Sequence, residues 1–392
     1  MNILFVHPRP ARISYKHMTA LSKVKGINVY LLCGNLGPDV LHQDIRKICR
    51  EYVKALPLAK IPFLYKTYRK VIKKYVQKWG IDLIQTYSEP DDAAVAAVES
   101  KVNVPIVFCN RDNVSAYSKE LLATRIVPRW IAYNRYLGWV PREILYKYIL
   151  YLEKKAHEKS DGRMYISPGM MEYSSKLHDI NGNNLVFTDW VLDEELPITY
   201  KKKLSEGTDD IHIGFSGGII IHDAYRNHLP FLNKLAKGKI HVHMHIVTRD
   251  EKSRQACREA VKKNRNLHLY EEVLPAREFI EQLSSYDWGI IPFETEWRYV
   301  DTLLTNKIYD YISAKIPVIS CNAKTLKRYI NENRLGFIYK DISDLREKLK
   351  KQNPLDYTID PSKFLISKNI HKVIKFYEKI IDEYHNNKNF NN

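Results

Sequence analysis

The chain has 392 residues, which is long enough for two domains of ordinary size. Its formal net charge of +17 favours anionic partners, namely nucleotides, nucleic acid or an anionic membrane surface. Five cysteines without C-x-x-C spacing indicate reduced thiols of a cytosolic protein and not a disulfide framework. No apolar run approaches the ~18 residues of a membrane span, and the apolar start of the chain is too short for a signal peptide.

Short apolar strands alternate with helical stretches along the whole chain. In the first half, strands are expected at residues 2–7, 27–33, 82–87, 105–109, 163–167 and 185–187. After residue 210 they are expected at 211–216, 240–247, 267–270, 287–292, 317–321 and 336–339. Strands separated by helices favour parallel sheets built from βαβ units. The predicted fold class is therefore α/β, with two doubly wound domains.

The composition also predicts where these domains begin and end. The first domain is expected over residues 1–195, followed by a polar linker over 196–210 and the second domain over 211–365. The last segment, 366–392, carries an apolar stripe at helical spacing and ends in a frayed Asn/Lys-rich tail. Because of this stripe, the last helix must pack on another surface.

Two clusters of polar residues follow expected strands of the first domain. Residues 88–92 follow one strand, and 110–113 follow the next. Ligands of open α/β sheets collect at the carboxyl ends of strands, so Glu89, Asp91 and Asp112 are candidate site residues. The alternative is that Asp91 and Asp112 only cap helices, as aspartate often does.

Two basic stretches of the first domain also contain aromatic residues. Residues 43–80 hold eleven Lys and Arg against two acids, and 125–159 interleave cations with Trp and Tyr. Cations beside aromatic rings suit the headgroup region of a bilayer. The same mixture could bind single-stranded nucleic acid, or could be an ordinary solvated helix face over core aromatics.

The second domain contains two features that suit an anionic ligand. The strand at 211–216 runs into Gly217 and Gly218, where a backbone without side chains lets a ligand approach closely. Further on, Lys307 and Asp310 lie three residues apart in a helix expected over 305–311. A cation and a carboxylate one turn apart could hold a phosphate and a sugar hydroxyl, although a glycine turn and a solvated ion pair are the simpler interpretations.

The segment around Lys307 resembles the donor-binding segment of GT-B glycosyltransferases of the "glycosyl transferases group 1" (family 4-like) kind. In these proteins a pattern such as N-K-x-x-(E/D)-Y, followed by P-V-I, contacts the nucleotide sugar, and Asn306 to Ile319 match it. Residues 267–293 are similar to another stretch of the same family. The resemblance implies the GT-B fold, with two Rossmann-like domains facing a central cleft and the last helix returning to the first domain.

The resemblance also assigns residues to the donor. The loop with Gly217 and Gly218 would lie against the diphosphate, with Arg226 as the nearest basic residue. Lys307 and Asp310 would contact the phosphate and the ribose. The remaining donor contacts are the nucleobase loop and the residues facing the sugar, which are Glu272, Val273, Phe293 and Glu294.

The chain departs from the family pattern in two places. Many members carry a second glutamate eight residues before the position of Asp310, but here that residue is Thr302. Asp301, Glu294 and Glu296 are the nearest acids that could replace it. The family's Gly-Gly loop after the first strand is also absent, and the basic residues available there for the diphosphate or an anionic acceptor are Arg9, Arg12 and, after a later strand, Arg111.

The implied activity is transfer of a hexosyl-type sugar from a nucleoside-diphosphate sugar to an acceptor hydroxyl, without a metal or other cofactor. Lys307 would stabilise the leaving diphosphate, and Glu89, Asp91 or Asp112 would be the base of an inverting reaction. The expected acceptor is a glycan or a lipid-linked molecule of surface glycan or glycolipid assembly. The protein would be cytoplasmic and peripheral on the inner face of the membrane, with no nucleic-acid partner.

Three alternatives remain open at this point. A nucleotide-sugar epimerase shares the fold but needs no acceptor, and a non-catalytic glycosyltransferase-like partner protein would bind nucleotide weakly or not at all. A nucleic-acid binder would show a steep salt dependence with polynucleotides. His241, His243 and His245 alternate along one strand, and this pattern is interpreted as a partly exposed strand rather than a metal site.

Overall fold

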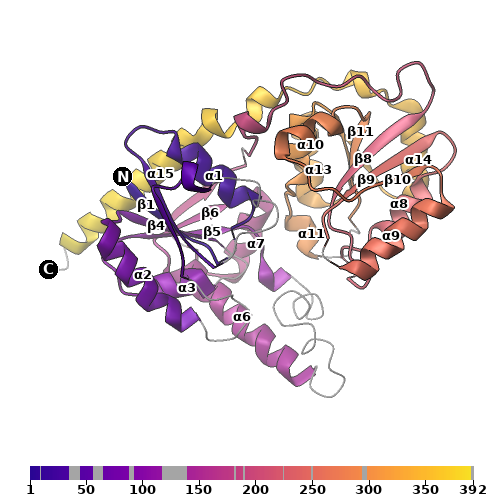
Figure 1. Cartoon of the computed structure of the whole chain (residues 1–392). Coiled ribbons are helices and arrows are strands. Elements are labelled where there is room, and N and C mark those ends of the chain that lie inside the picture. Colours follow the sequence, from indigo (N-terminus) through magenta and orange to yellow (C-terminus); the bar gives the residue numbers. More distant parts are fainter. Residues whose placement is uncertain are drawn as a thin grey trace. The chain divides into compact units, whose positions relative to one another are not determined.

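The computed structural model of the protein describes residues 1–8, 10–34, 45–55, 65–87, 92–116, 139–180, 182–188, 190–223, 225–248, 250–293 and 298–389. The chain divides into two compact units (Figure 1). The first comprises Met1–Trp190 together with Ile366–Asn392, and the second comprises Val191–Leu365. The first unit is therefore built from both ends of the chain.

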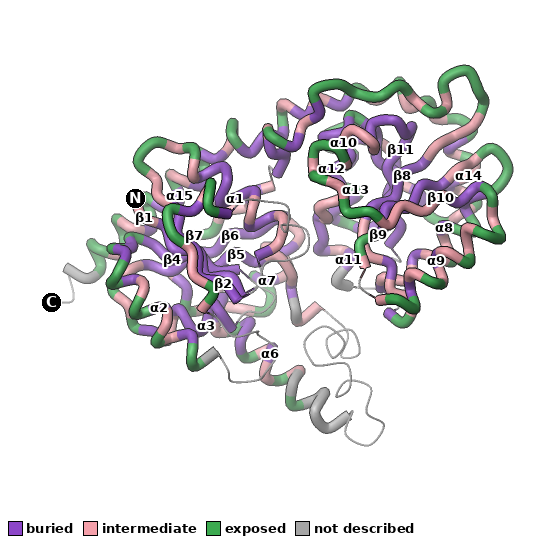
Figure 2. The backbone as a smooth tube through the Cα atoms, in the orientation of Figure 1, coloured by how far each residue is buried: buried purple, intermediate pink, exposed green. Residues whose placement is uncertain are grey.

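A seven-stranded parallel sheet forms the centre of the first unit, in the order β3-β2-β1-β4-β5-β6-β7. Its strands are β1 (Asn2–Val6), β2 (Asn28–Cys33), β3 (Glu51–Lys54), β4 (Leu83–Tyr87), β5 (Ile106–Asn110), β6 (Gly162–Tyr165) and β7 (Asn183–Val186). Its helices are α1 (Arg12–Ser22), α2 (Tyr65–Trp79), α3 (Asp92–Glu99), α6 (Trp139–Lys159), α7 (Pro168–Leu177) and α15 (Ile366–Asn389). Strands β4 and β5 are buried along their whole length (Figure 2), as expected of a sheet covered on both faces.

The last helix, α15, packs on the sheet of the first unit. The hydroxyl of Tyr377 donates to the side-chain oxygen of Gln85 in β4 over 2.9 Å. A methyl group at Gly162 in β6 would clash with Ile380, so α15 lies directly against the backbone of that strand. The apolar stripe of this helix therefore completes the core of the first unit.

The second unit contains a six-stranded parallel sheet in the order β10-β9-β8-β11-β12-β13. Its strands are β8 (Ile211–Gly217), β9 (Ile240–Ile246), β10 (Leu267–Tyr270), β11 (Trp288–Ile291), β12 (Val318–Cys321) and β13 (Gly336–Tyr339). Its helices are α8 (Leu229–Leu235), α9 (Glu251–Lys263), α10 (Ala276–Leu283), α11 (Arg298–Thr302), α12 (Lys307–Ser313), α13 (Lys324–Glu332) and α14 (Ile342–Lys351). The predicted α/β class with two doubly wound parallel sheets is confirmed.

Within the described residues, every expected strand is present, with its ends shifted by at most two residues. Strand β3 was not expected, because its sequence, EYVK, is half polar and it forms the exposed edge of the sheet. The basic stretch of residues 43–80 therefore does not form one element, since strand β3 and helix α2 both lie within it.

The segment expected as a linker, 196–210, does not run free of both units. The ammonium group of Lys203 donates to the carbonyl oxygens of Ser284 and Tyr286 over 3.0 and 2.6 Å. The hydroxyl of Ser205 donates to Asp287 over 2.5 Å. The second unit consequently begins at Val191, twenty residues before the predicted start at 211. The polar composition predicted an exposed segment, but the side chains of Lys203 and Ser205 form hydrogen bonds with residues between α10 and β11.

Candidate functional site

Each sheet has one point where the strand order reverses, and ligands of open α/β sheets bind at the carboxyl ends of the strands there. In the first unit this point lies between β1 and β4, and in the second it lies between β8 and β11.

In the second unit, the side chain of Lys307 lies over the carboxyl end of β8. A Cβ atom added to Gly217 would stand 2.9 Å from both Cε and Nζ of Lys307. Gly217 also has a φ angle of +132°, which other residues rarely adopt. Gly217 and Lys307, which are ninety positions apart in the sequence, thus meet, and the positive φ angle favours glycine at this contact.

The electrostatic surroundings of Lys307 favour an anion. Burial and the nearby charge of Arg226 lower the pKa of the Lys307 ammonium group to about 8, while Asp310 acts in the opposite direction. Arg226 lies in the loop between β8 and α8, with its Nε atom 3.9 Å from the Asp223 carboxylate. Two cations close enough to influence each other, next to open backbone, suit an anionic ligand.

Aromatic rings enclose this lysine. Nζ of Lys307 lies 5.7 Å from the ring centroid of Phe215 and 5.5 Å from that of Phe293. Tyr225 stacks on Phe293 at 5.2 Å, and His228 meets the same ring edge-on at 5.5 Å. Burial, with a smaller contribution from Lys307, lowers the pKa of His228 to about 3, so this imidazole is neutral at ordinary pH.

The sequence pointed to Phe293 but missed Tyr225 and His228. Both lie in the same loop as Arg226, directly after β8. Their position beyond the carboxyl end of a predicted strand was the one signal that could have found them.

Helix α12 is fixed on the sheet by its buried face. Ile308, Tyr311 and Ile312 are fully buried, which confirms the predicted apolar stripe. The Tyr311 hydroxyl donates to the carbonyl oxygen of Ile290 over 2.9 Å. A methyl group at Gly289 in β11 would clash with the Tyr311 ring, so the helix lies directly on that strand. This packing sets the position of Lys307 at the first turn and of Asp310, which is 6% exposed, one turn later.

For the other residues assigned to the donor, the structure gives weaker support for a place in this site. A Cβ atom at Gly218 would make only an ordinary contact with the carbonyl oxygen of Val247, at 3.5 Å. Glu272 and Val273 are exposed in the loop between β10 and α10, two strands away from β8. Glu294 and Glu296 lie outside the described residues.

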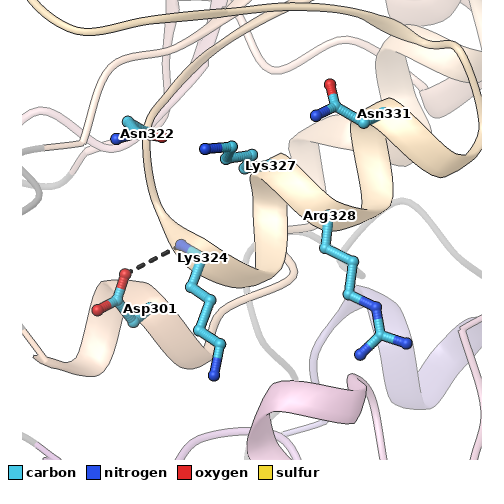
Figure 3. A pocket seen from close by; sticks show the side chains of 6 residues that line it. All are labelled: Asp301, Asn322, Lys324, Lys327, Arg328 and Asn331. Atoms are coloured by element: carbon cyan, nitrogen blue, oxygen red, sulfur yellow. Dashed lines mark hydrogen bonds between the residues drawn. The ribbon is translucent and has the colours of Figure 1, made fainter.

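Asp301 has a structural partner of its own. Its carboxylate accepts the backbone N–H of Lys324 over 3.0 Å and so caps helix α13, whose own N-cap residue is Ala323 (Figure 3). A cavity of about 420 Å³ opens beside this contact, and it is lined by Asp301, Asn322, Lys324, Lys327, Arg328 and Asn331. Lys307 does not line this cavity, whose α13 side chains are exposed.

In the first unit, His7 follows β1 at the reversal point and is 2% exposed. The Ser14 hydroxyl donates to the carbonyl oxygen of Ala11 over 2.8 Å, so its oxygen accepts a hydrogen bond from Nδ1–H of His7 over 3.0 Å. This leaves Nε2 of His7 as an acceptor. Burial and the charge of Arg111 hold the pKa of His7 well below its usual value. Sequence analysis did not select His7, although it directly follows a strand.

Tyr87, the last residue of β4, stacks on His7 at 4.9 Å. Its hydroxyl is 2.8 Å from Nδ1 of His17, whose Nε2 is 3.3 Å from the hydroxyl of Tyr377. Since Tyr377 donates to Gln85, it accepts from His17, and Tyr87 then donates to His17. A chain of hydrogen bonds therefore connects α15 to the carboxyl end of β4.

The residues predicted at this edge are only partly described. Arg111 and Asp112 are half-buried in the loop after β5, and Arg12 is half-buried in the first turn of α1. The other predicted residues, Arg9, Glu89 and Asp91, lie outside the described residues.

Asp92, which sequence analysis did not select, begins α3 and is 7% exposed. Burial raises the pKa of its carboxyl group to about 7, although hydrogen bonds from the backbone of Ala93 and of Asp92 itself lower it. A carboxyl group with a pKa near neutrality can accept or release a proton under physiological conditions.

Comparisons with known proteins agree with this architecture. Residues 224–375 match the model of the glucosyltransferase 3-like C-terminal domain. A solved glycosyltransferase of Rickettsia africae shares 15% identity at a TM-score of 0.67, covering 97% of this chain and 98% of that one. Anabaena HepE, solved in complex with UDP-glucose, shares 9% identity at 0.65, covering 96% and 99%.

WaaG, a glycosyltransferase involved in lipopolysaccharide biosynthesis, shares 11% identity at a TM-score of 0.56, covering 89% of this chain and 90% of WaaG. No curated protein matches the sequence. The chain thus has the GT-B glycosyltransferase fold, which confirms the resemblance seen in the sequence. Over the described residues, no helix combines the length and the apolar character needed to cross a membrane.

Proposed function

We propose that the protein transfers a sugar from a nucleoside-diphosphate sugar to an acceptor hydroxyl, with no metal taking part in the transfer step. The observation that carries this proposal is the position of Lys307, which lies against Gly217 and near Arg226 at the reversal point of the second sheet. The match of residues 224–375 to a glucosyltransferase-type domain supports the same conclusion.

Lys307 would act on the leaving group. Negative charge builds on the diphosphate as the bond to the sugar breaks, and fixed donors aimed at this charge lower the barrier. Lys307, Arg226 and the backbone N–H groups of Gly217 and Gly218 supply such donors, while Asp310 would accept a hydroxyl of the ribose. Phe293, on which Tyr225 stacks, excludes water on one side of the ammonium group, which strengthens the interaction of that group with an anion. Uridine diphosphate is the first nucleotide to test, because HepE has been solved with UDP-glucose.

The acceptor would bind at the carboxyl edge of the first sheet. Nε2 of His7 would accept a hydrogen bond from an acceptor hydroxyl, and Arg111 adds a positive charge nearby. If the reaction inverts the sugar, Asp112 or Asp92 would be the base, and burial raises the pKa of Asp92 to about 7, which suits this role. Glu89, Asp91, Arg9 and Arg12 remain candidates from the sequence. The lipopolysaccharide role of WaaG supports a surface glycan or lipid-linked acceptor.

The first test replaces Lys307 with alanine. Thermal unfolding is measured with UDP, GDP, CDP and ADP, each with and without a sugar, because a ligand that binds the folded state raises the melting temperature. One nucleotide should stabilise the wild type and not Lys307→Ala, and turnover of its sugar should fall by about 10²–10³. Lys327→Ala, which removes an exposed lysine of α13, is the matched control and should behave as the wild type.

The same panel separates the alternative functions. Nucleotide binding with release of an altered nucleotide sugar, without acceptor, would indicate an epimerase. Unchanged melting with every nucleotide would contradict the proposal and favour a non-catalytic protein. Near-normal turnover by Lys307→Ala would remove this residue from the site.

A cytoplasmic location on an anionic membrane surface is the second part of the proposal. Helix α2 buries Tyr68, Ile72, Val76 and Trp79 in the core of the first unit. Its opposite face exposes five lysines, which are Lys66, Lys70, Lys73, Lys74 and Lys78. Each basic residue near an anionic bilayer contributes about 1 kcal/mol, so this face is sufficient for reversible attachment.

Vesicle sedimentation tests this attachment. The wild type should bind vesicles containing phosphatidylglycerol at low salt and be released by high salt, because the attraction is screened. The triple change Lys70→Glu, Lys73→Glu and Lys74→Glu should abolish binding. The same change at Lys252, Lys262 and Lys263 on α9 alters the net charge equally and should leave binding largely intact, whereas equal loss in both variants would contradict a specific role of α2.

A further inference from the structure

Strands β8 and β11, which are neighbours at the reversal point of the second sheet, separate before either strand ends. Their pairing covers two residues of each strand and ends at Gly214 and Gly289. Beyond this pair, β8 continues beside β9 as far as Gly217, and β11 continues beside β12 as far as Ile291. The two strand ends therefore form a fork that opens towards the carboxyl edge of the sheet.

The hydroxyl group of Tyr311 lies in this fork. It accepts the backbone N–H of Ser216 in β8 over 3.4 Å and donates to the carbonyl oxygen of Ile290 in β11 over 2.9 Å. In the register of the two strands, the next hydrogen bond of a parallel ladder would join these same two backbone groups directly. Burial raises the pKa of this hydroxyl above its usual value, so the hydroxyl keeps its proton and remains a donor. It therefore replaces one bond of the ladder and holds the strand ends apart.

Two tyrosine rings lie against the last paired residues of the fork. A methyl group at Gly289 would clash with the ring of Tyr311, and one at Gly214 would clash with the ring of Tyr286. The hydroxyl of Tyr286 lies 2.8 Å from Nε2 of His245 in β9. Of the two tyrosines, Tyr311 is consequently the one whose hydroxyl joins β8 to β11.

Helix α12 links this fork to the proposed nucleotide site. Lys307 precedes Tyr311 by four residues, so both side chains leave the same face of the helix. Lys307 lies against Gly217, and Tyr311 binds the backbone of Ser216, the residue before it. The helix thus holds two consecutive residues at the end of β8. A shift of the fork would move the Gly217 backbone relative to the ammonium group.

We propose that Tyr311 is a positioning residue for the diphosphate of the donor nucleotide. Its bridge between the two strands keeps the fork open and so fixes the Gly217 backbone relative to Lys307. Donors that are held in place beforehand stabilise the negative charge of a leaving group most effectively. Since Tyr311 is fully buried, it would act through these groups and would not touch the nucleotide. This inference rests on the proposed function, because it assigns a role within the same site.

A pair of tyrosine variants tests this role. Tyr311→Phe keeps the ring against Gly289 and removes only the bridging hydroxyl. Tyr286→Phe is the matched control, because it removes a buried hydroxyl of the same unit outside the fork. Both variants should lower the melting temperature by a similar amount. Only Tyr311→Phe should weaken the binding of UDP, by about 10–100-fold, which is the size of one hydrogen bond to a charged group.

Uridine, which carries no diphosphate, distinguishes positioning from general destabilisation. Calorimetric titration measures the affinity for UDP, and NMR shifts on titration measure that for uridine. Uridine should bind Tyr311→Phe as it binds the wild type, and Tyr286→Phe should bind both ligands as the wild type does. Equal weakening of UDP and uridine by Tyr311→Phe, or an equal effect of both variants on UDP, would overturn the positioning role.

A measurement without nucleotide separates this role from the proposed function. NMR titration of the Lys307 ammonium group should give a pKa of about 8 in the wild type and in Tyr286→Phe. In Tyr311→Phe the pKa should rise towards its ordinary value of 10.5, because the ammonium group loses its fixed, buried place. Arg226 and Asp310, the charged groups that act on this ammonium group, are the same in both variants. An unchanged pKa would overturn the inference, whereas the expected rise in a protein that binds no nucleotide would refute the proposed function alone.

The wild type also allows a test that does not depend on the folding of a variant. Because the Tyr311 hydroxyl is buried between two hydrogen-bond partners, its proton should exchange slowly with solvent and be visible by NMR. This proton should show a nuclear Overhauser contact with the backbone N–H of Ser216. A rapidly exchanging hydroxyl proton without that contact would overturn the inference.

Discussion

At the scale of single residues, Lys307 is the side chain on whose charge the proposed nucleotide site of the second unit depends. Its ammonium group is half-buried between Phe215 and Phe293 and lies close to Arg226. These surroundings lower its pKa from 10.5 to about 8, so its charge is lost at a pH where an exposed lysine would keep it.

This shift predicts a pH dependence of nucleotide binding. Lys307 is cationic below about pH 8 and becomes neutral above it, so affinity for a nucleoside diphosphate should fall as the pH rises from 7 to 9.5. Calorimetric titration at several pH values measures this change. Lys307→Arg keeps its charge over the whole range, and its affinity should be nearly constant. An equal decline in wild type and Lys307→Arg would assign the dependence to another group.

At the scale of elements, histidines line one face of β8, β9 and β10. Nδ1 of His212 is 2.9 Å from Nε2 of His243, and Nδ1 of His241 is 3.2 Å from Nε2 of His268. His245 is 2.8 Å from the hydroxyl of Tyr286. The sequence predicted a partly exposed strand, and this was wrong for His243 and His245, which are 3% and 5% exposed because Tyr270 and Tyr286 stack on them.

Burial, with repulsion from neighbouring histidines, lowers the pKa of His243 to about 2, and burial alone lowers that of His245 to about 4. The carboxylates facing this group are Asp210, 3.9 Å from Nε2 of His241, and Asp287, which accepts the backbone N–H of His212. Within this group of histidines, the two carboxylates counteract the lowering of the pKa only at His212. The folded state therefore keeps His243 and His245 neutral where the unfolded chain, with a pKa near 6.5, would bind protons.

We expect the second unit to lose stability as the pH falls from about 6.5 to 4, by roughly 3 kcal/mol for each such histidine at pH 4. Thermal unfolding between pH 7 and 4 measures this loss. His243→Gln removes one of these groups and should show a shallower decline, whereas His371→Gln, an exposed change on α15, should decline as the wild type does. An unchanged slope in His243→Gln would contradict this explanation.

At the scale of the whole molecule, the two units depend differently on chain continuity. The second unit is one continuous segment, Val191–Leu365, and it contains every described residue assigned to the donor. The first unit needs α15, whose Tyr377 and Phe376 are buried against it, and this helix lies about 175 residues after the rest of that unit.

A fragment of residues 191–365 should therefore fold alone and bind the same nucleotide as the full chain. A fragment of residues 1–190 should not unfold cooperatively, because it lacks the apolar face of α15 and leaves the side chain of Gln85 without Tyr377. Circular dichroism and thermal unfolding test both fragments. Joining residues 366–392 to the fragment of residues 1–190 through a flexible linker should restore the folding of that fragment. Cooperative folding of 1–190 alone would contradict this role of α15.

Periodicity predicted the strands well, because a buried parallel strand is a short continuous apolar run. The pattern of Lys307, Asp310 and Pro317 also gave the correct helix and strand. Strand β3 escaped prediction because an edge strand needs no apolar run. The segment 196–210 was misassigned because a hydrogen bond from Lys203 to a distant carbonyl leaves no trace in local composition.

The sequence by itself determined the fold class and the need of the last helix for a partner, and it selected Gly217 and Lys307 as candidate donor residues, since each of these depends on residue type at short spacing. Only the tertiary structure decided that these two features touch, that Tyr225 and His228 pack against Phe293 beside Lys307, and that Asp301 caps a helix. Such contacts arise where strand ends meet across a sheet or helices pack on it, and residues far apart in sequence are neighbours only there.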